Sequence, residues 1–145
     1  MGNSNILTSD EDIRDLLKGT HRIAVLGIKP ETHSGQPAFY VPKYMQDAGY
    51  EIIPVPAYYP EVTGIMGCRV YRDLRDVPGE IDMVDVFRRS EDISKHIEEL
   101  LAAKPKSVWF QLGITNDHVA EQLAEAGIKV VQNMCLMVEH RALMR

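Results

Sequence analysis

The chain has 145 residues and a formal net charge of −5. A chain of this length buries about 68–70% of the surface that its unfolded form exposes, so we expect a single domain over residues 1–145. It contains no run of five or more basic residues. Together with the acidic balance, this argues against sequence-independent binding to a nucleic-acid backbone. A phosphorylated small molecule remains compatible with the charge.

The two cysteines, Cys68 and Cys135, allow at most one disulfide, and neither lies in a metal-binding Cys or His spacing. Residues 1–12 are polar and acidic, unlike the basic and then apolar segments of a signal peptide. No apolar stretch approaches the ~20 residues of a membrane-spanning helix. We therefore expect a cytoplasmic protein that holds no metal and does not enter a membrane.

Helix and strand patterns alternate along the first half of the chain. Ser9 precedes an acidic turn, as a helix N-cap does. Pro37 suits the first position of a helix, whereas Pro42 predicts a local irregularity inside it. In chain order we expect a helix over 9–19, a strand over 23–27, a loop over 28–36, a helix over 37–48 and a strand over 51–55.

The second half of the chain opens with a long segment of weak pattern, rich in Pro, Gly and Tyr. In it we expect a short strand over 69–71 and a helical turn near Leu74. After it we expect a strand over 81–87, a helix over 91–103, a strand over 107–111, a helix over 116–126, a strand over 128–131 and a helix over 136–143. Strands alternating with helices predict an α/β fold, namely a Rossmann-like doubly wound, mainly parallel sheet flanked by helices in three layers.

Ligands in such sheets bind at the carboxyl ends of the strands, so the loops there are the candidate sites. The first loop leads to a helix start around residues 34–37, where backbone N–H groups attract anions, and Lys29 adds a positive charge. The dinucleotide fingerprint and the P-loop sequence are both missing. A plain connection with a solvated lysine explains this loop equally well.

The next two strand ends differ in charge. Residues 54–58 contain no acid, and Glu61 is the first to follow, which disfavours NAD because NAD sites use an acid there to hold the ribose. The prolines of this segment could simply end the strand. At the following strand end, Arg88 and Arg89 suit a phosphate-rich ligand and Phe87 could cover an adenine ring. The alternative without a ligand is a pair of solvated arginines that precede a helix.

The last two strand ends are less charged. Gly113 would allow a ligand to approach the backbone, while Gln111 would contact the ligand or only satisfy a loop carbonyl. Cys135 lies at the final strand end, and a buried inert thiol is favoured over a nucleophile, although His140 follows five residues on. The chain has no Gly-x-Ser-x-Gly elbow and no His-x-x-x-His metal pair. Of the histidines, only His33 is a candidate ligand contact.

Five segments together resemble a known family: Gly27 after an apolar strand, Ile-Pro-Val-Pro at 53–56, Val-Asp-Val-Phe-Arg-Arg at 84–89, Val-Trp-Phe-Gln-Leu-Gly-Ile at 108–114, and Cys135 with Glu139-His140. The chain resembles the stand-alone CoA-binding protein family, which is similar to the N-terminal CoA-binding domain of the succinyl-CoA synthetase α subunit. The resemblance extends from about residue 13 to residue 140. Lys29, Pro56-Ala57 and Met134 depart from the family pattern.

The resemblance implies a Rossmann-type fold with CoA lying across the carboxyl ends of the strands. It implies that the loop over 27–36 holds the phosphates, that residues 54–57 flank the nucleotide, that residues 87–89 contact CoA and that residues 111–114 shape the floor of the site. The implied cofactor-binding residues are Gly27, Ile28, Lys29, Ser34, Gly35, Gln36, Pro54, Val55, Pro56, Ala57, Phe87, Arg88, Arg89, Gln111, Gly113 and Ile114.

These expectations favour a CoA or acyl-CoA binding protein without catalytic machinery, acting as a regulatory or carrier module. The phosphorylated histidine of the synthetase belongs to a domain that this chain lacks. The alternatives are an acyl-transfer or redox enzyme that uses Cys135, and a protein that binds NAD or another adenine nucleotide. A protein partner or a homo-oligomer stays open, because the apolar residues near the C-terminus suit a core or an interface equally well: Met134, Leu136, Met137 and Leu143.

Overall fold

A five-stranded parallel sheet with the strand order β2-β1-β5-β6-β7 forms the centre of the protein. The computed structural model describes residues 3–144. The sheet strands are β1 (Arg22–Leu26), β2 (Glu51–Val55), β5 (Met83–Val86), β6 (Ser107–Phe110) and β7 (Lys129–Val131). The chain runs outward from β1 to β2, returns to β5 on the other side of β1, and then continues to β6 and β7. The direction of winding therefore switches between β1 and β5.

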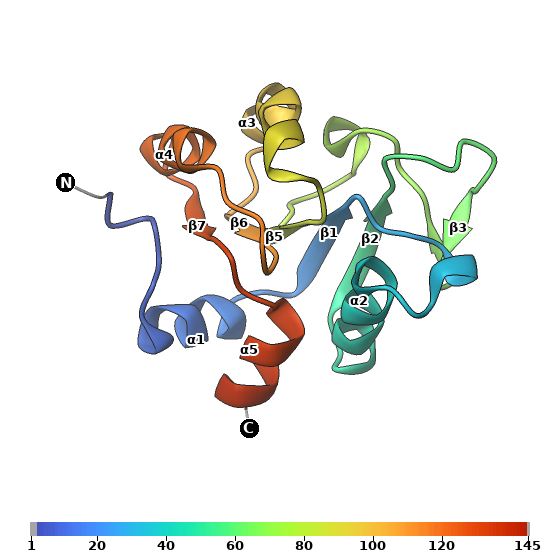
Figure 1. Ribbon diagram of the computed structural model, residues 1–145, viewed down its shortest axis with the longest axis horizontal. Coiled ribbons are helices and arrows are strands. Elements are labelled where there is room, and N and C mark those ends of the chain that lie inside the picture. The colour runs from blue at the N-terminus through green and yellow to red at the C-terminus, as the bar shows by residue number, and fades with distance from the viewer. Residues whose placement is uncertain (1–2, 145) are drawn as a thin grey trace.

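Helices cover both faces of the sheet (Figure 1). One face carries α1 (Asp10–Lys18), α2 (Pro37–Asp47) and α5 (Leu136–Leu143), and the other carries α3 (Ile97–Ala103) and α4 (Asp117–Glu125). Each interface encloses its own apolar cluster, and the neighbours Met83 and Val84 of β5 belong to opposite clusters. That alternation follows from the two-residue period of a strand. The expected three-layer α/β fold is confirmed.

The helix starts expected from the sequence have their capping contacts. The N–H of Asp12 donates to the Ser9 hydroxyl at 3.2 Å, and the N–H of Val119 donates to the Asn116 side chain at 3.1 Å. Each bond satisfies one of the N–H groups that a helix start leaves unpaired. Pro37 is the first residue of α2, and that helix continues through Pro42 without a break.

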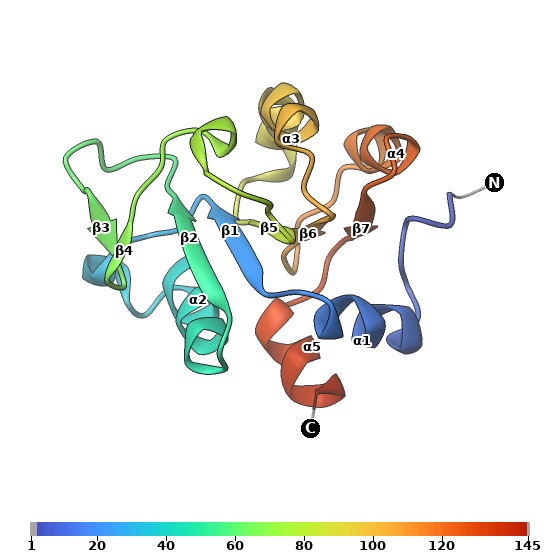
Figure 2. The ribbon, with the colours of Figure 1, turned by 180° about the vertical axis from the view of Figure 1, so that it is seen from behind.

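Two segments differ from the sequence expectations. The strand expected over 69–71 is β4 (Cys68–Arg69), which pairs antiparallel with β3 (Gly64–Ile65) in a separate hairpin beside β2 (Figure 2). The helix expected over 91–103 begins instead as a 3₁₀ helix, η3 (Ser90–His96), and becomes α-helical only at Ile97. The carbonyl of Ser90 accepts the side-chain N–H of Asn116 at 3.3 Å, so the first turn is tied to the next loop.

The helical turn expected near Leu74 is the 3₁₀ helix η2 (Leu74–Asp76). The apolar residues near the C-terminus belong to the core of this chain, with Leu136 fully buried and Met134, Met137 and Leu143 packed against the cluster under α5. Among residues 3–144 no helix is long and apolar enough to cross a membrane.

Candidate functional site

The carboxyl ends of β1 and β5 meet closely at the switch point. Gly27 follows β1 with φ +90°, and a Cβ atom there would lie 2.3 Å from the Phe87 carbonyl oxygen. The N–H of Phe87 donates to the Leu26 carbonyl at 2.8 Å, and that of Gly27 donates to the Val55 carbonyl at 2.8 Å. Only glycine fits both the positive φ and this close approach. Gly27 therefore shapes the floor of the crevice.

A pocket of about 460 Å³ opens at this edge of the sheet. Its wall combines residues that follow β1, β5, β6 and β7: Lys29, Gln36, Pro37, Ala38, Tyr40, Phe87, Arg88, Arg89, Gln111, Leu112, Ile114 and Cys135. The crevice outside the carboxyl ends at a switch point is where open α/β sheets bind their ligands. The pocket is thus the candidate functional site.

The two arginines of the pocket differ in how firmly they are held. The side chain of Arg88 is 17% exposed, and its Nε donates to Nε2 of His96 at 3.2 Å. Its guanidinium also lies 3.9 Å from the Asp92 carboxylate and 6.0 Å from the centre of the Tyr58 ring. Arg89 is 81% exposed and lies 4.0 Å from Glu91. The pocket therefore has one guanidinium that neighbouring side chains hold and one that is largely exposed to solvent.

Gln111 supports the pocket from below. It is 4% exposed, and its side-chain oxygen accepts the N–H of Leu136 at 3.1 Å, at the first residue of α5. Its amide oxygen thus satisfies a helix N–H, which differs from the loop carbonyl considered from the sequence. The bond fixes the start of α5 and, with it, the half-buried Cys135 that precedes the helix.

A second hollow of about 520 Å³ lies at the end of β2, lined by Ala57, Tyr58, Pro60 and Arg72. The guanidinium of Arg72 fixes this loop by donating to the carbonyls of Tyr58, Tyr59 and Val62 at 3.0, 2.7 and 2.6 Å. Because Tyr58 also faces Arg88, the two hollows are neighbours. The carboxyl edge therefore offers room for an extended ligand.

The residues expected at the site fall into three groups. Those in the wall of the main pocket are Lys29, Gln36, Phe87, Arg88, Arg89, Gln111 and Ile114. Ala57 lines the neighbouring hollow. Those outside both linings are Gly27, Ile28, Ser34, Gly35, Pro54, Val55, Pro56 and Gly113. Gly113 acts through its backbone N–H, which donates to the Asn133 side chain at 2.7 Å.

The sequence reasoning missed the part of the wall that Tyr40 of α2 provides, whereas Leu112 lies within the segment 111–114 that was expected to shape the floor. Tyr40 is 40% exposed and Leu112 is 69% exposed, although both are large and apolar. Tyr40 stands one helical turn after Gln36, which was expected at the site. Tyr40 could therefore have been predicted at the site, because i, i+4 spacing places two residues on the same side of a helix. Exposed apolar side chains beside a pocket are typical of a ligand-binding rim.

The two histidines considered from the sequence lie elsewhere. The ring of His33 packs against Tyr59 with 5.4 Å between the ring centres, outside the main pocket. His140 lies against Tyr44 and Tyr50, and its Nδ1 is 3.0 Å from the Tyr44 hydroxyl. Burial lowers the pKa of His140. His140 lines a different hollow from Cys135, so the two do not form a nucleophile and base pair.

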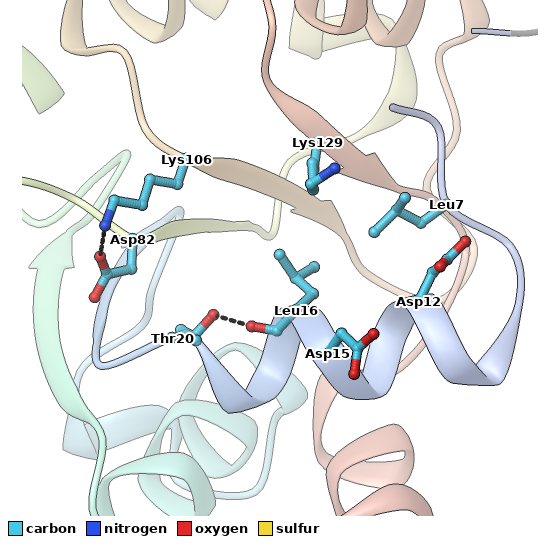
Figure 3. A pocket seen from close by; sticks show the side chains of 9 residues that line it. Leu7, Asp12, Asp15, Leu16, Thr20, Asp82, Lys106 and Lys129 are labelled. Atoms are coloured by element: carbon cyan, nitrogen blue, oxygen red, sulfur yellow. Dashed lines mark hydrogen bonds and ion pairs between the residues drawn. The ribbon is translucent and has the colours of Figure 1, made fainter. Parts of the chain in front are cut away.

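The opposite edge of the sheet carries a further hollow of about 380 Å³, beside α1 (Figure 3). Asp82 in it accepts the N–H groups of His21 and Arg22 at 2.9 Å each and lies 3.5 Å from Lys106. Burial alone would raise the pKa of Asp82, but the N–H groups of Arg22 and His21, with Lys106, outweigh it and hold the pKa below its usual value. The Asp82 carboxylate thus links the segments that lead into β1, β5 and β6.

No group of three His, Cys, Asp or Glu side chains suited to a metal ion occurs within residues 3–144. The open parallel sheet, its helices on both faces and the crevice at its switch point define a Rossmann-like α/β protein. Residues 21–141 match the family model described as a CoA binding domain, and the chain belongs to that family. The resemblance drawn from the five sequence segments is thereby confirmed.

Proteins from bacteria and archaea resemble the whole chain. The uncharacterized protein YneT of Bacillus subtilis (strain 168) is 37% identical over 134 residues, which covers 91% of this chain and 94% of YneT. The structure of cell-free ID.343 from Thermus thermophilus is 37% identical with a TM-score of 0.85, covering 94% of this chain and 99% of that one. A hypothetical protein from Pyrococcus horikoshii OT3 is 31% identical with a TM-score of 0.84, covering 100% and 98%.

A likeness of fold extends to a larger enzyme. The dinucleotide forming acetyl-coenzyme A synthetase 1 of Ca. Korarchaeum cryptofilum, in complex with phosphate and ADP, is 18% identical with a TM-score of 0.64. The match covers 81% of this chain and 27% of the synthetase. At this identity the comparison concerns the arrangement of strands and helices alone.

Proposed function

We propose that the protein binds CoA or acyl-CoA in the pocket at the β1 and β5 switch point and carries out no chemistry of its own. The observation that carries this proposal is a fixed arginine beside an apolar pocket at the carboxyl edge of a CoA binding domain. The ligand would make the protein a carrier, sensor or regulatory module that acts with a partner. The two free cysteines favour a cytoplasmic location, because disulfides form and persist mainly in oxidising compartments.

The charges around the pocket suit the phosphates of CoA. Arg88 and Arg89 follow β5, and Lys29 stands opposite them after β1 with its ammonium hydrogen-bonded to Gln36. Guanidinium groups bind phosphate oxygens through paired, charge-assisted hydrogen bonds. We therefore assign the pyrophosphate and the 3′-phosphate to the space between these three cations.

The two neighbouring hollows suit the two ends of CoA. The apolar side chains of Tyr40, Leu112 and Ile114 offer a wall for the pantetheine arm, which would lead its thiol toward Cys135. The adenosine would extend toward Ala57 and Tyr58 at the end of β2. That strand end carries no acid to bind the ribose of NAD, which supports CoA over NAD.

A thermal-shift titration with CoA, dephospho-CoA and NAD in parallel tests the proposal. A ligand at 100 times its dissociation constant adds about 2.7 kcal/mol to the free energy of unfolding. We expect CoA to raise the melting temperature, dephospho-CoA to raise it less, and NAD to leave it nearly unchanged. No shift with CoA would contradict the proposal, and a larger shift with NAD would favour the adenine-nucleotide alternative.

Substitution of the arginines locates the phosphates. We expect Arg88→Ala to weaken CoA binding by about 1–3 kcal/mol through the loss of charge-assisted bonds. Arg89→Ala serves as the matched comparison, because its exposed side chain must be immobilised by the ligand and so contributes less. Equal affinity of wild type and Arg88→Ala, measured by isothermal titration calorimetry, would show that the phosphates lie elsewhere.

Cys135 supports a second candidate function, an acyl-transfer or redox enzyme, because it lines the same pocket. The contacts of His140 with Tyr44 and Tyr50 leave it unsuited to activate this thiol. Cys135→Ala separates the two functions. Unchanged CoA affinity without any lost turnover of an acyl-CoA would support the binding module, whereas a turnover that disappears with the thiol would establish the enzyme.

A further inference from the structure

Arg88 is held by a series of contacts that leaves the pocket and ends on the backbone of η2. Its Nε donates to Nε2 of His96 at 3.2 Å, and Nδ1 of His96 lies 2.5 Å from a carboxylate oxygen of Glu99. The second oxygen of Glu99 accepts the N–H of Leu74 at 3.0 Å. The side chains of His96 and Glu99 are 17% and 12% exposed. The arginine is therefore fixed from behind by two largely buried groups.

The chemistry of these groups assigns the proton on His96. The Nε of arginine can only donate a hydrogen bond, so Nε2 of His96 must accept it. The proton of the neutral ring then sits on Nδ1, where it faces the Glu99 carboxylate. Glu99 thus selects the tautomer that can receive Arg88, and its own position is fixed by the backbone of Leu74.

A neutral acceptor offers an advantage over a carboxylate at this place. A carboxylate bonded directly to Arg88 would cancel much of the charge that an anionic ligand needs. The nearby Asp92 lies 3.9 Å from the guanidinium and is itself bonded to Lys95 at 2.9 Å. His96 holds the arginine by its Nε alone. The Nη2 of Arg88 is in an ion pair with Asp92 at 3.9 Å, which is too long for a hydrogen bond, so both terminal nitrogens still have N–H groups to donate to a ligand.

We propose that His96 is a positioning residue for ligand binding, which, oriented by Glu99, holds the guanidinium of Arg88 ready for a phosphate group. This inference rests on the proposed function, since it concerns how the same pocket binds CoA. A long side chain that is ordered before the ligand arrives loses less conformational entropy on binding. Arg89 lacks such support and is 81% exposed, so it serves as a comparison for Arg88 within the same pocket.

The test compares the CoA affinity of wild type with that of His96→Ala, His96→Gln, Arg88→Ala and the double variant Arg88→Ala with His96→Ala. We expect His96→Ala to weaken binding by about tenfold, the scale of one hydrogen bond to a charged group. His96→Gln should recover most of the affinity, because its side-chain oxygen can accept the Nε–H of Arg88. The double variant should bind as Arg88→Ala does.

Each outcome distinguishes the inference from the proposed function. Failure of wild type to bind CoA would overturn both. Wild-type affinity in His96→Ala, or a loss of the same size with and without Arg88, would overturn the positioning role and leave the CoA site intact. If His96→Ala does not fold, nuclear magnetic resonance measures the exchange of the Arg88 Nε–H with solvent in wild type and in His96→Gln. Protection from exchange in both proteins supports the positioning role. Rapid exchange in the ligand-free wild-type protein overturns it.

Discussion

The backbone N–H of Lys29 donates to the carbonyl of Ala38 at 3.1 Å and so joins the loop after β1 to the first turn of α2. In an α-helix that carbonyl would accept the N–H of the residue four positions later. Here that residue is Pro42, which has no N–H. The proline inside the helix therefore releases an acceptor that fixes the loop of the candidate site, and Lys29 is placed in the pocket wall by this bond.

Pro42→Ala should loosen this loop without weakening the helix. The new N–H would compete with Lys29 for the Ala38 carbonyl, while alanine is about 3 kcal/mol more favourable than proline in a helix interior. We expect the melting temperature to hold or rise and the Lys29 amide to exchange faster with solvent, as measured by hydrogen exchange with nuclear magnetic resonance. Lys43→Ala on the exposed side of α2 is the control. Unchanged exchange at Lys29 would contradict the role of Pro42.

Gly27→Ala should destabilise the protein and impair the pocket. The added Cβ would lie 2.3 Å from the Phe87 carbonyl oxygen, and φ is +90°. We expect the free energy of unfolding to fall by at least about 2 kcal/mol, from backbone strain and displacement of the β5 end. Gly35→Ala is the matched control, because a Cβ there meets nothing within 4 Å. Similar urea midpoints for the two variants would show that the strand ends separate easily.

Gln111→Ala should destabilise the start of α5. The N–H of the fully buried Leu136 would lose its acceptor, which costs about 1–3 kcal/mol for a buried donor. Chemical unfolding measures this loss. Gln122→Ala on the exposed surface of α4 should change stability little. A loss no larger than that of Gln122→Ala would mean that another group replaces the Gln111 oxygen.

The features that the sequence predicted well are local ones. The caps Ser9 and Asn116 and the buried strands are encoded in short patterns of polarity, and parallel strands bring their carboxyl ends to one edge without further information. The contact of Arg88 with His96 was not predicted, because it depends on η3 turning as a 3₁₀ helix. The approach of Tyr58 to Arg88 likewise depends on a long irregular loop whose shape Arg72 determines.

Asp85 is the other feature that the sequence left unexplained. It lies in the centre of β5, paired with Val25 on one side and Trp109 on the other, and is fully buried. Neither carboxylate oxygen has a hydrogen-bond partner within residues 3–144. Burial therefore raises the pKa of Asp85 well above its usual value, because the apolar surroundings disfavour the charged form. Burial at this position therefore favours the protonated form of the Asp85 side chain.

Stability should therefore fall as pH rises because of Asp85. The unfolded chain releases this proton near pH 3.8, while the folded protein keeps it up to its raised pKa. The free energy of unfolding is therefore unaffected by Asp85 below pH 3.8 and falls as the pH rises from there toward the raised pKa. Within that window wild type should lose up to about 1.4 kcal/mol for each pH unit relative to Asp85→Asn, which cannot titrate. Urea unfolding from pH 4 to 7 measures the difference. The exposed Asp15→Asn serves as the control, and parallel pH profiles for wild type and Asp85→Asn would show that Asp85 ionises in the folded protein much as it does in the unfolded chain.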